Sequence, residues 1–276
     1  YYSEICSEVV LVDEEQPYLS ATNISALKKR GIIYIPYEAG CAPVLEKRLI
    51  AASQSKNIYL VHSNHDERYT YHGLLACVAE LENDKKITFC AGQAVAVRRD
   101  DSGIYYTRAY KNLCGYQNIN KVKQRLYYHA ETYVPLAHYS VWRRESYISV
   151  TERTIAVHNL MPSQTILDEV IFELAADLAG NSKATPELYW IRNRINPPRI
   201  NPPSNTVIEK GEHVFKMLEN NLKILINDLD NVQMDMIINS FRKHFLFMRT
   251  SFLSKSIIFI KRIPVSYTHL RAHETR

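Results

Sequence analysis

Residues 56–74 read KNIYLVHSNHDERYTYHGL, and this stretch decides the fold that the sequence predicts. Residues 56–61 end in the apolar run IYLV, which is typical of a buried strand. After a polar stretch, residues 72–82 return to the spacing of a helix. The order of strand, polar turn and helix is the repeating step of an α/β protein.

The same step recurs on both sides of this stretch. We expect further strands at 8–12, 31–35 and 87–97, with helices at 20–29 and 43–53. Such alternation predicts an α/β fold whose sheet is mainly parallel and covered by helices on both faces. Ligands of such sheets bind at the carboxyl ends of the strands.

The later part of the chain is less regular. It predicts strands at 104–107 and 138–142, a helix at 165–179 that Gly180 caps, and closing helices at 212–225 and 232–247. Residues 196–203 carry four prolines, which exclude a helix and indicate a connector.

Composition narrows the class of protein. The length of 276 residues fits one domain with an appendage. With 23% charged side chains and a net charge of +5, the composition is that of an ordinary soluble protein. Lysines and arginines are mixed with acids, so a nucleic-acid-binding protein is disfavoured. Five cysteines without CxxC spacing indicate reduced core residues in a cytosolic protein rather than a zinc site or disulfides.

Two segments near the end of the chain carry no prediction of a membrane span or a metal site. The apolar stretch 245–263 is interrupted by charges and falls short of a membrane-spanning helix, so we expect a cytoplasmic protein that meets the inner face of a membrane at most peripherally. Residues 265–276, VSYTHLRAHETR, resemble a translated sequencing adapter, and the spacing of His269 and His273 carries no metal prediction.

Polar side chains follow strand 56–61 at the edge where ligands bind. Asp66, with Glu67 or Asn64, offers the hard oxygen ligands that a divalent cation such as Mn²⁺ or Mg²⁺ takes beside a nucleoside diphosphate. The alternative is a solvated turn whose acids cap the next helix.

The run 40–73 resembles the family 2-like glycosyltransferases of the GT-A fold. That family shows a glycine-containing loop, a helix, a strand and an Asp-x-Asp type cluster, which match Gly40, 43–53, 58–61 and 64–67 here. The likeness covers residues 8–195 and includes the pattern at 179–192, which resembles a bacterial subgroup. It implies a GT-A-like mixed, mainly parallel sheet.

The resemblance also implies a division of the chain. Residues 1–195 form the transferase domain, with the family's first strand expected upstream of Tyr1. The rest divides into a linker at 196–204, a helical region at 205–264 and a non-native tail at 265–276.

By the same resemblance, the protein moves a sugar from a nucleotide donor to a glycan or lipid-linked acceptor in bacterial polysaccharide synthesis, with inversion. Asp13 then lies near the nucleoside, and Arg143 or Arg144 stabilises the departing phosphates. Glu169 is the expected base and Asp168 the next choice.

Two alternatives stay open. Acids in the first turn of a helix are also what the helix dipole selects, which would give Asp168 and Glu169 no catalytic part. The whole chain is alternatively an inactive relative that binds a nucleotide sugar, because the acidic cluster departs from two aspartates.

Overall fold

The computed structural model describes residues 1–14, 18–38, 40, 42–64, 67–101, 103–110, 119–160, 165–195, 212–226 and 233–243. The strands are β1 (Val9–Asp13), β2 (Ile32–Pro36), β3 (Tyr59–Val61), β4 (Glu67–Tyr69), β5 (Ile87–Asp100), β6 (Gly103–Ala109), β7 (Val141–Arg143) and β8 (Asn181–Asn193). The helices are α1 (Tyr2–Ile5), α2 (Ala21–Lys29), α3 (Pro43–Gln54), α4 (Tyr71–Asn83), α5 (Val122–Thr132), the 3₁₀-helix η2 (Ala137–Tyr139), α6 (Arg144–Leu160), α7 (Thr165–Ala179) and α9 (Glu212–Leu225). Residues 233–243 are also helical.

The main sheet is mixed, so the prediction of a mainly parallel sheet is wrong. Its strands lie in the order β3-β7-β5-β8-β4, with β6 also paired to β5. Among the described strands of this sheet, β5 and β8 are the one parallel pair. The reason is that β3 and β5 are not neighbours despite the helix between them. Strand β7 returns between them antiparallel, and β6 folds back from β5 as a hairpin.

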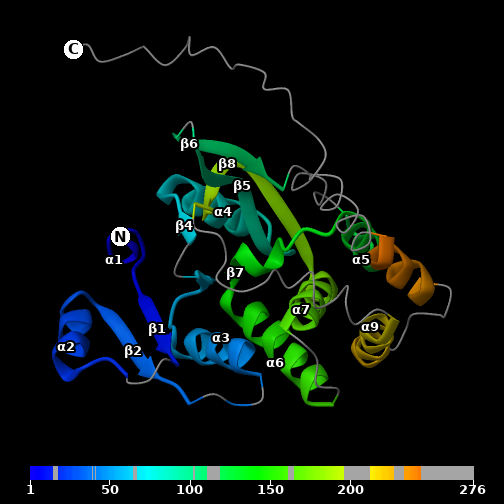
Figure 1. Cartoon of the computed structure of the whole chain (residues 1–276), viewed down its shortest axis with the longest axis horizontal. Helices are drawn as coiled ribbons and strands as arrows, with labels where there is room; N and C mark the ends of the chain where they lie inside the picture. Colours follow the sequence, from blue (N-terminus) through cyan, green and yellow to red (C-terminus); the bar gives the residue numbers. More distant parts are fainter. Residues whose placement is uncertain are drawn as a thin grey trace, which may run out of the picture.

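The first two strands form a sheet of their own. Strand β1 pairs in parallel with β2, and α2 packs against β2. Figure 1 shows this small unit in blue, apart from the main sheet and beside α3. Strand β1 contacts α3, and an ion pair between Glu14 and Lys47 places the carboxyl end of β1 next to that helix.

Helices cover both faces of the main sheet, as predicted. Phe89 and Cys90 are neighbours along β5 and therefore point to opposite faces. Phe89 stacks on Trp142 at 4.5 Å between ring centroids, and Phe172 of α7 lies edge-on to the same indole. On the other face, Cys90 meets Cys77 of α4.

Two glycines permit close packing. A Cβ at Gly73 in α4 would lie 2.5 Å from the Leu188 carbonyl oxygen and from the Tyr189 Cα, so α4 can approach β8 only without a side chain there. Gly180 follows α7 directly, at the position where the sequence predicts its C-cap. It has no positive φ, and its place is explained instead by the Thr88 side chain, which a Cβ would strike.

Several elements were absent from the sequence prediction, namely α1, β4, α5, α6 and β8. Strand β8 contains Pro186 and passes β5 with register shifts, so neither alternation nor composition reveals a strand. In α6 the buried face includes Thr151 and Thr154, whose hydroxyls donate to carbonyls one turn back and mask the apolar stripe. The predicted strand 138–142 is η2 followed by β7.

The remaining predictions on segments fall partly outside the described residues. Among those that are described, the predicted helices 20–29, 43–53, 72–82, 165–179 and 212–225 are confirmed as α2, α3, α4, α7 and α9. The connector 196–203 and the tail 265–276 lie outside the described residues. Within the described ranges, no helix is both long and apolar enough to cross a membrane.

Candidate active site

The loop after β3 leads into an aromatic cluster. The Asn64 side-chain amide donates to the Tyr139 hydroxyl at 3.4 Å, and Glu67 N–H donates to the Asn64 carbonyl at 3.2 Å. Asp66 itself lies outside the described residues. The nearest described residues on either side, Asn64 and Glu67, both contact this cluster. Asn64 contacts Tyr139, and Glu67 contacts Trp190 and Arg192 of β8.

Glu67 is buried, and its side chain is hydrogen-bonded. Its carboxylate accepts hydrogen bonds from the Trp190 indole N–H and, at 3.2 Å, from the Arg192 Nε. These bonds join β4 to β8 and neutralise Arg192. The metal-ligand role predicted for Glu67 stays a prediction, and the contact that the structure shows is with β8.

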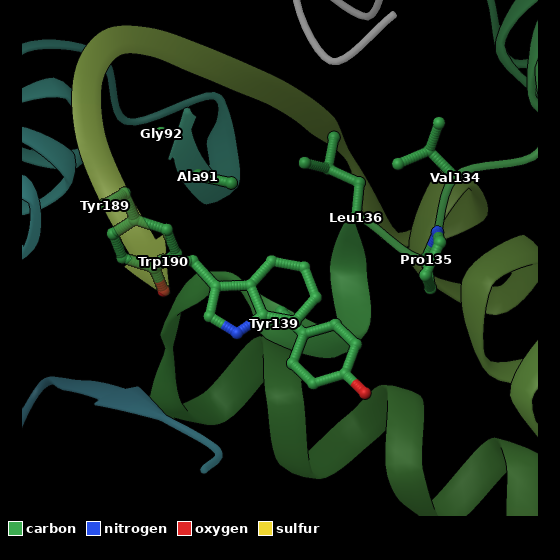
Figure 2. A pocket seen from close by; sticks show the side chains of 8 residues that line it. All are labelled: Ala91, Gly92, Val134, Pro135, Leu136, Tyr139, Tyr189 and Trp190. Carbon is green, nitrogen blue, oxygen red and sulfur yellow. The ribbon is translucent and has the colours of Figure 1, made fainter. Parts of the chain in front are cut away.

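The Arg192 guanidinium lies among three aromatic rings. Its guanidinium carbon is 4.6 Å from the centre of the Trp190 ring, 5.2 Å from that of Tyr139 and 5.4 Å from that of Tyr110. Tyr139 stacks on Trp190 with 3.9 Å between centroids. Figure 2 shows these two rings side by side at a small gap that Val134 and Leu136 also line. The gap measures about 10 Å³, which is room for one water at most, so it is not a substrate site.

A larger cavity lies between α3 and α7. It measures about 70 Å³ and is lined by Val44, Leu45, Arg48, His138, Asp168 and Glu169. The two acids predicted for catalysis therefore share a cavity. The first two lining residues are apolar, and the other four offer a cation, an imidazole and two carboxylates.

Arg48 is the cation of this cavity and is only 6% exposed. Its Nη1 lies 3.0 Å from His138 Nδ1, whereas its Nε has no hydrogen-bond partner among the described residues. Burial lowers the pKa of His138 well below the usual value, and the charge of Arg48 lowers it further, so the imidazole is neutral. No salt bridge joins Arg48 to a carboxylate within the described part of the chain.

The two carboxylates of the cavity have different partners. Asp168 Oδ1 lies 2.9 Å from His158 Nδ1 of α6. Glu169 Oε1 accepts a hydrogen bond of 2.7 Å from the Tyr133 hydroxyl, which follows α5. Each partner reaches its acid from an element other than α7, which fixes the start of that helix from two sides.

The cavity and the aromatic cluster adjoin each other. Burial raises the pKa of the Tyr139 hydroxyl, Arg192 opposes the rise, and the charges of Glu169 and Glu67 add to it. Both acids therefore lie near one hydroxyl, one arriving from α7 and the other from β4. Asn64, in the loop after β3, donates to the same hydroxyl, so this loop and the start of α7 lie on the same side of the molecule.

The structure does not bring Arg143 and Arg144 to this site. Arg143 pairs with Tyr59 at the start of β3, the end of β7 opposite to Tyr139. Its guanidinium donates to backbone carbonyls of Leu81, Asp84 and Ile87, around the end of α4. Arg144 donates to the Ser55 carbonyl at the end of α3, at 2.9 Å. Carbonyls at helix ends lack partners within the helix and attract cations.

Asp13 lies at the end of β1 and accepts a hydrogen bond of 2.9 Å from the Tyr34 hydroxyl. The next residue, Glu14, forms an ion pair of 2.8 Å with Lys47 of α3. Asp13 is thus beside the helix that carries Arg48. Among the described residues, no group of three or more His, Cys, Asp or Glu side chains is arranged to hold a metal.

Sequence reasoning missed Arg48, Tyr133, His138 and Trp190 as site residues. For Arg48 a signal existed, because it lies one turn after Val44 and Leu45 on the apolar side of the predicted helix, where a charge is unexpected. Arg192 ends the pattern 179–192 that was identified from the sequence, but without a role. The others became visible only through contacts between distant segments.

The architecture resembles the GT-A fold of S. aureus TarS. The chain superposes on the crystal structure of S. aureus TarS 1-349 in complex with UDP with a TM-score of 0.53 and 14% identity. That match covers 91% of this chain and 66% of the other. The structures of TarS 1-349 alone and of TarS match with TM-scores of 0.51 and 0.53, the latter over 40% of its chain. No protein-family model and no curated protein matches the sequence.

Proposed function

We propose that this chain is a glycosyltransferase domain that moves a sugar from a nucleoside diphosphate donor to a hydroxyl of a glycan or lipid-linked acceptor. The likeness of its fold to the UDP complex of TarS supports the donor class. The observation that carries the proposal is the cavity between α3 and α7, where Arg48 stands with Asp168 and Glu169.

In the proposed reaction a carboxylate removes the proton from the acceptor hydroxyl as its oxygen attacks the sugar carbon. The bond from that carbon to the phosphate oxygen breaks, and the nucleoside diphosphate leaves with inversion. We assign the base to Glu169. Its Oε1 accepts a hydrogen bond from the Tyr133 hydroxyl, which holds the carboxylate at the wall of the cavity. Asp168 is the second choice.

We assign the phosphate contact to Arg48 rather than to Arg143 or Arg144. A guanidinium matches phosphate oxygens, and Arg48 keeps an unpaired Nε beside the cavity, whereas the other two bind helix-end carbonyls. Asp13, at the neighbouring end of β1, is the proposed nucleoside contact.

A divalent cation, Mn²⁺ or Mg²⁺, remains part of the proposal. Asp66 with Asn64 would hold it, and bound there it would screen the charge of the diphosphate. The donor set fits in chemistry, since both side chains offer oxygen. The Asn64 oxygen lies 3.1 Å from His62 Nε2, so it is ordered by a neighbour near the aromatic cluster.

Calorimetric titration of the chain with UDP, with and without Mn²⁺, tests the proposal. We expect binding that needs the metal in the parent chain and is lost in Asp66→Ala, and release of UDP when UDP-sugars and acceptors are supplied. Binding without any turnover would favour the inactive relative. A chain that does not bind UDP under either condition would refute the donor assignment.

A further inference from the structure

Helix α7 carries three acids on one face, at Glu169, Glu173 and Asp177. Residues four apart in a helix lie above one another, so the three form one stripe. Each contacts a side chain or backbone group from the segment 129–138. Glu169 also lines the cavity, whereas Glu173 and Asp177 are fully buried and do not.

Of the three acids, Glu173 is the one that binds the backbone of η2. Its two oxygens accept hydrogen bonds from two successive backbone N–H groups, those of Ala137 at 2.9 Å and His138 at 2.8 Å. These are amides of η2, which a short helix leaves without internal partners. His129 Nε2 lies 3.5 Å from the same carboxyl group, and His129 Nδ1 lies 2.8 Å from Asp177.

The two residues at the end of η2 are site residues. His138 contacts Arg48 and lines the cavity. Tyr139 stacks on Trp190 and accepts a hydrogen bond from Asn64, next to the loop that holds Asp66. The placement of η2 therefore sets both the cavity wall and the aromatic cluster.

We propose that Glu173 is a positioning residue of the nucleotide-sugar site, which holds η2 so that His138 meets Arg48 and Tyr139 meets Trp190. It touches no ligand itself. The proposal rests on the proposed function, because the ligand of the site is assigned there. Either protonation state leaves each oxygen a lone pair for an amide, so the clamp does not depend on titration.

Glutamine is the informative replacement. It has nearly the shape of glutamate, but its side-chain nitrogen has no lone pair and would point N–H groups at a backbone N–H. One of the two η2 amides then loses its acceptor inside the protein, which is costly. We expect Glu173→Gln to shift η2 and to leave the rest of the fold in place.

The chain has two tryptophans, and both contact η2. The Trp142 indole N–H donates to the Ala137 carbonyl at 2.6 Å, and Trp190 stacks on Tyr139. Tryptophan emission therefore reports the position of η2 without any enzymatic assay. The matched control is Glu152→Gln, because Glu152 lies exposed on α6.

The experiment measures tryptophan emission, far-UV circular dichroism and the dissociation constant for UDP with Mn²⁺ present. Glu173→Gln should keep the circular dichroism, change the emission and weaken UDP binding about tenfold, the scale of one lost buried hydrogen bond. Glu152→Gln should match the parent. Unchanged emission and UDP affinity in folded Glu173→Gln would overturn the proposal.

Glu173→Asp is the second variant. It keeps both acceptor oxygens at shorter reach, so it should recover part of the lost affinity. If the glutamine variant does not fold, the aspartate variant decides, since unchanged emission and affinity there would again overturn the proposal. If the parent does not bind UDP, the proposed function fails, and the emission measurement still tests the clamp.

Discussion

Two side chains in one cavity, Arg48 and Glu169, carry most of the chemistry proposed for this protein. Arg48 reaches the cavity from α3 and Glu169 from α7. Arg48 is buried beside the neutral imidazole of His138, and Glu169 accepts a hydrogen bond from the Tyr133 hydroxyl. A cation and a carboxylate held apart in this way suit a leaving phosphate and a base respectively.

Replacement of Glu169 by glutamine should leave UDP binding intact and lower turnover by a factor on the order of a hundred or more, because the amide cannot take a proton. Its oxygen still accepts the Tyr133 hydroxyl, so the fold should persist. Initial rates of UDP release, with Glu152→Gln as control, measure the effect. Loss of UDP binding in Glu169→Gln would instead give Glu169 a structural role.

Replacement of Arg48 by methionine should weaken UDP binding by about tenfold or more, since a charged contact with phosphate is lost. Methionine fills similar space, and removal of a buried charge need not destabilise the protein. The control is Arg144→Met, which should retain UDP affinity because Arg144 binds the Ser55 carbonyl. If calorimetry shows weaker UDP binding in Arg144→Met and unchanged UDP binding in Arg48→Met, the phosphate role belongs to Arg144, as the sequence predicts.

At the scale of elements, α4 approaches β8 closely at Gly73. Thr70 caps α4 by accepting the Gly73 N–H at 3.1 Å, and its own hydroxyl donates to the Leu188 carbonyl. The helix start is thus fixed to β8 through one threonine and one glycine. Strand β8 in turn carries Trp190 and Arg192 into the site.

Replacement of Gly73 by alanine should lower the free energy of unfolding by about 1–3 kcal/mol, because the new methyl group meets backbone atoms that cannot move aside. Urea unfolding measures the loss. Gly31→Ala is the comparison, since a Cβ there meets nothing within 4 Å and only the φ of +73° is unfavourable, at about 1–2 kcal/mol. Equal stability of Gly73→Ala and the parent would contradict the close approach.

At the scale of the whole molecule, buried acids and a histidine join α5, η2 and α7. Burial raises the pKa of Glu173 to about 8. Burial alone would lower the pKa of His129, but Asp177 and Glu173 raise it, and the net direction is upward. Both groups therefore bind protons more tightly in the folded chain than in the unfolded one.

The free energy of unfolding should fall as the pH rises. The contribution of Glu173 is complete below its unfolded pKa of 4.5 and is lost as the pH rises through about 8, while that of His129 is lost above 6.5. Urea unfolding at about pH 6 and about pH 9 should show this loss, and Glu173→Gln should show a smaller one. A parent chain that is more stable at the higher pH would contradict the assignment.

The sequence by itself determined helix α7 and, except for α1 and β4, the strands and helices of the first hundred residues. The apolar periodicity of each of these segments shows which of its sides is buried, and it can be read without knowing the rest of the fold. The GT-A fold was also predicted, from the resemblance of ordered motifs, and the likeness to the TarS structures confirms that fold. Asp168 and Glu169 were singled out by the same resemblance, which places an acidic pair at the start of this helix.

Only the tertiary structure decided which strands are neighbours and which cation meets the acids. Strand β7 inserts between β3 and β5, and β8 runs beside β5 from far along the chain, so strand order is a property of long-range pairing that local periodicity does not encode. Arg143 and Arg48 have the same chemistry in the sequence. In the folded chain, the Arg143 guanidinium donates to carbonyls at the end of α4, whereas Arg48 lines the cavity.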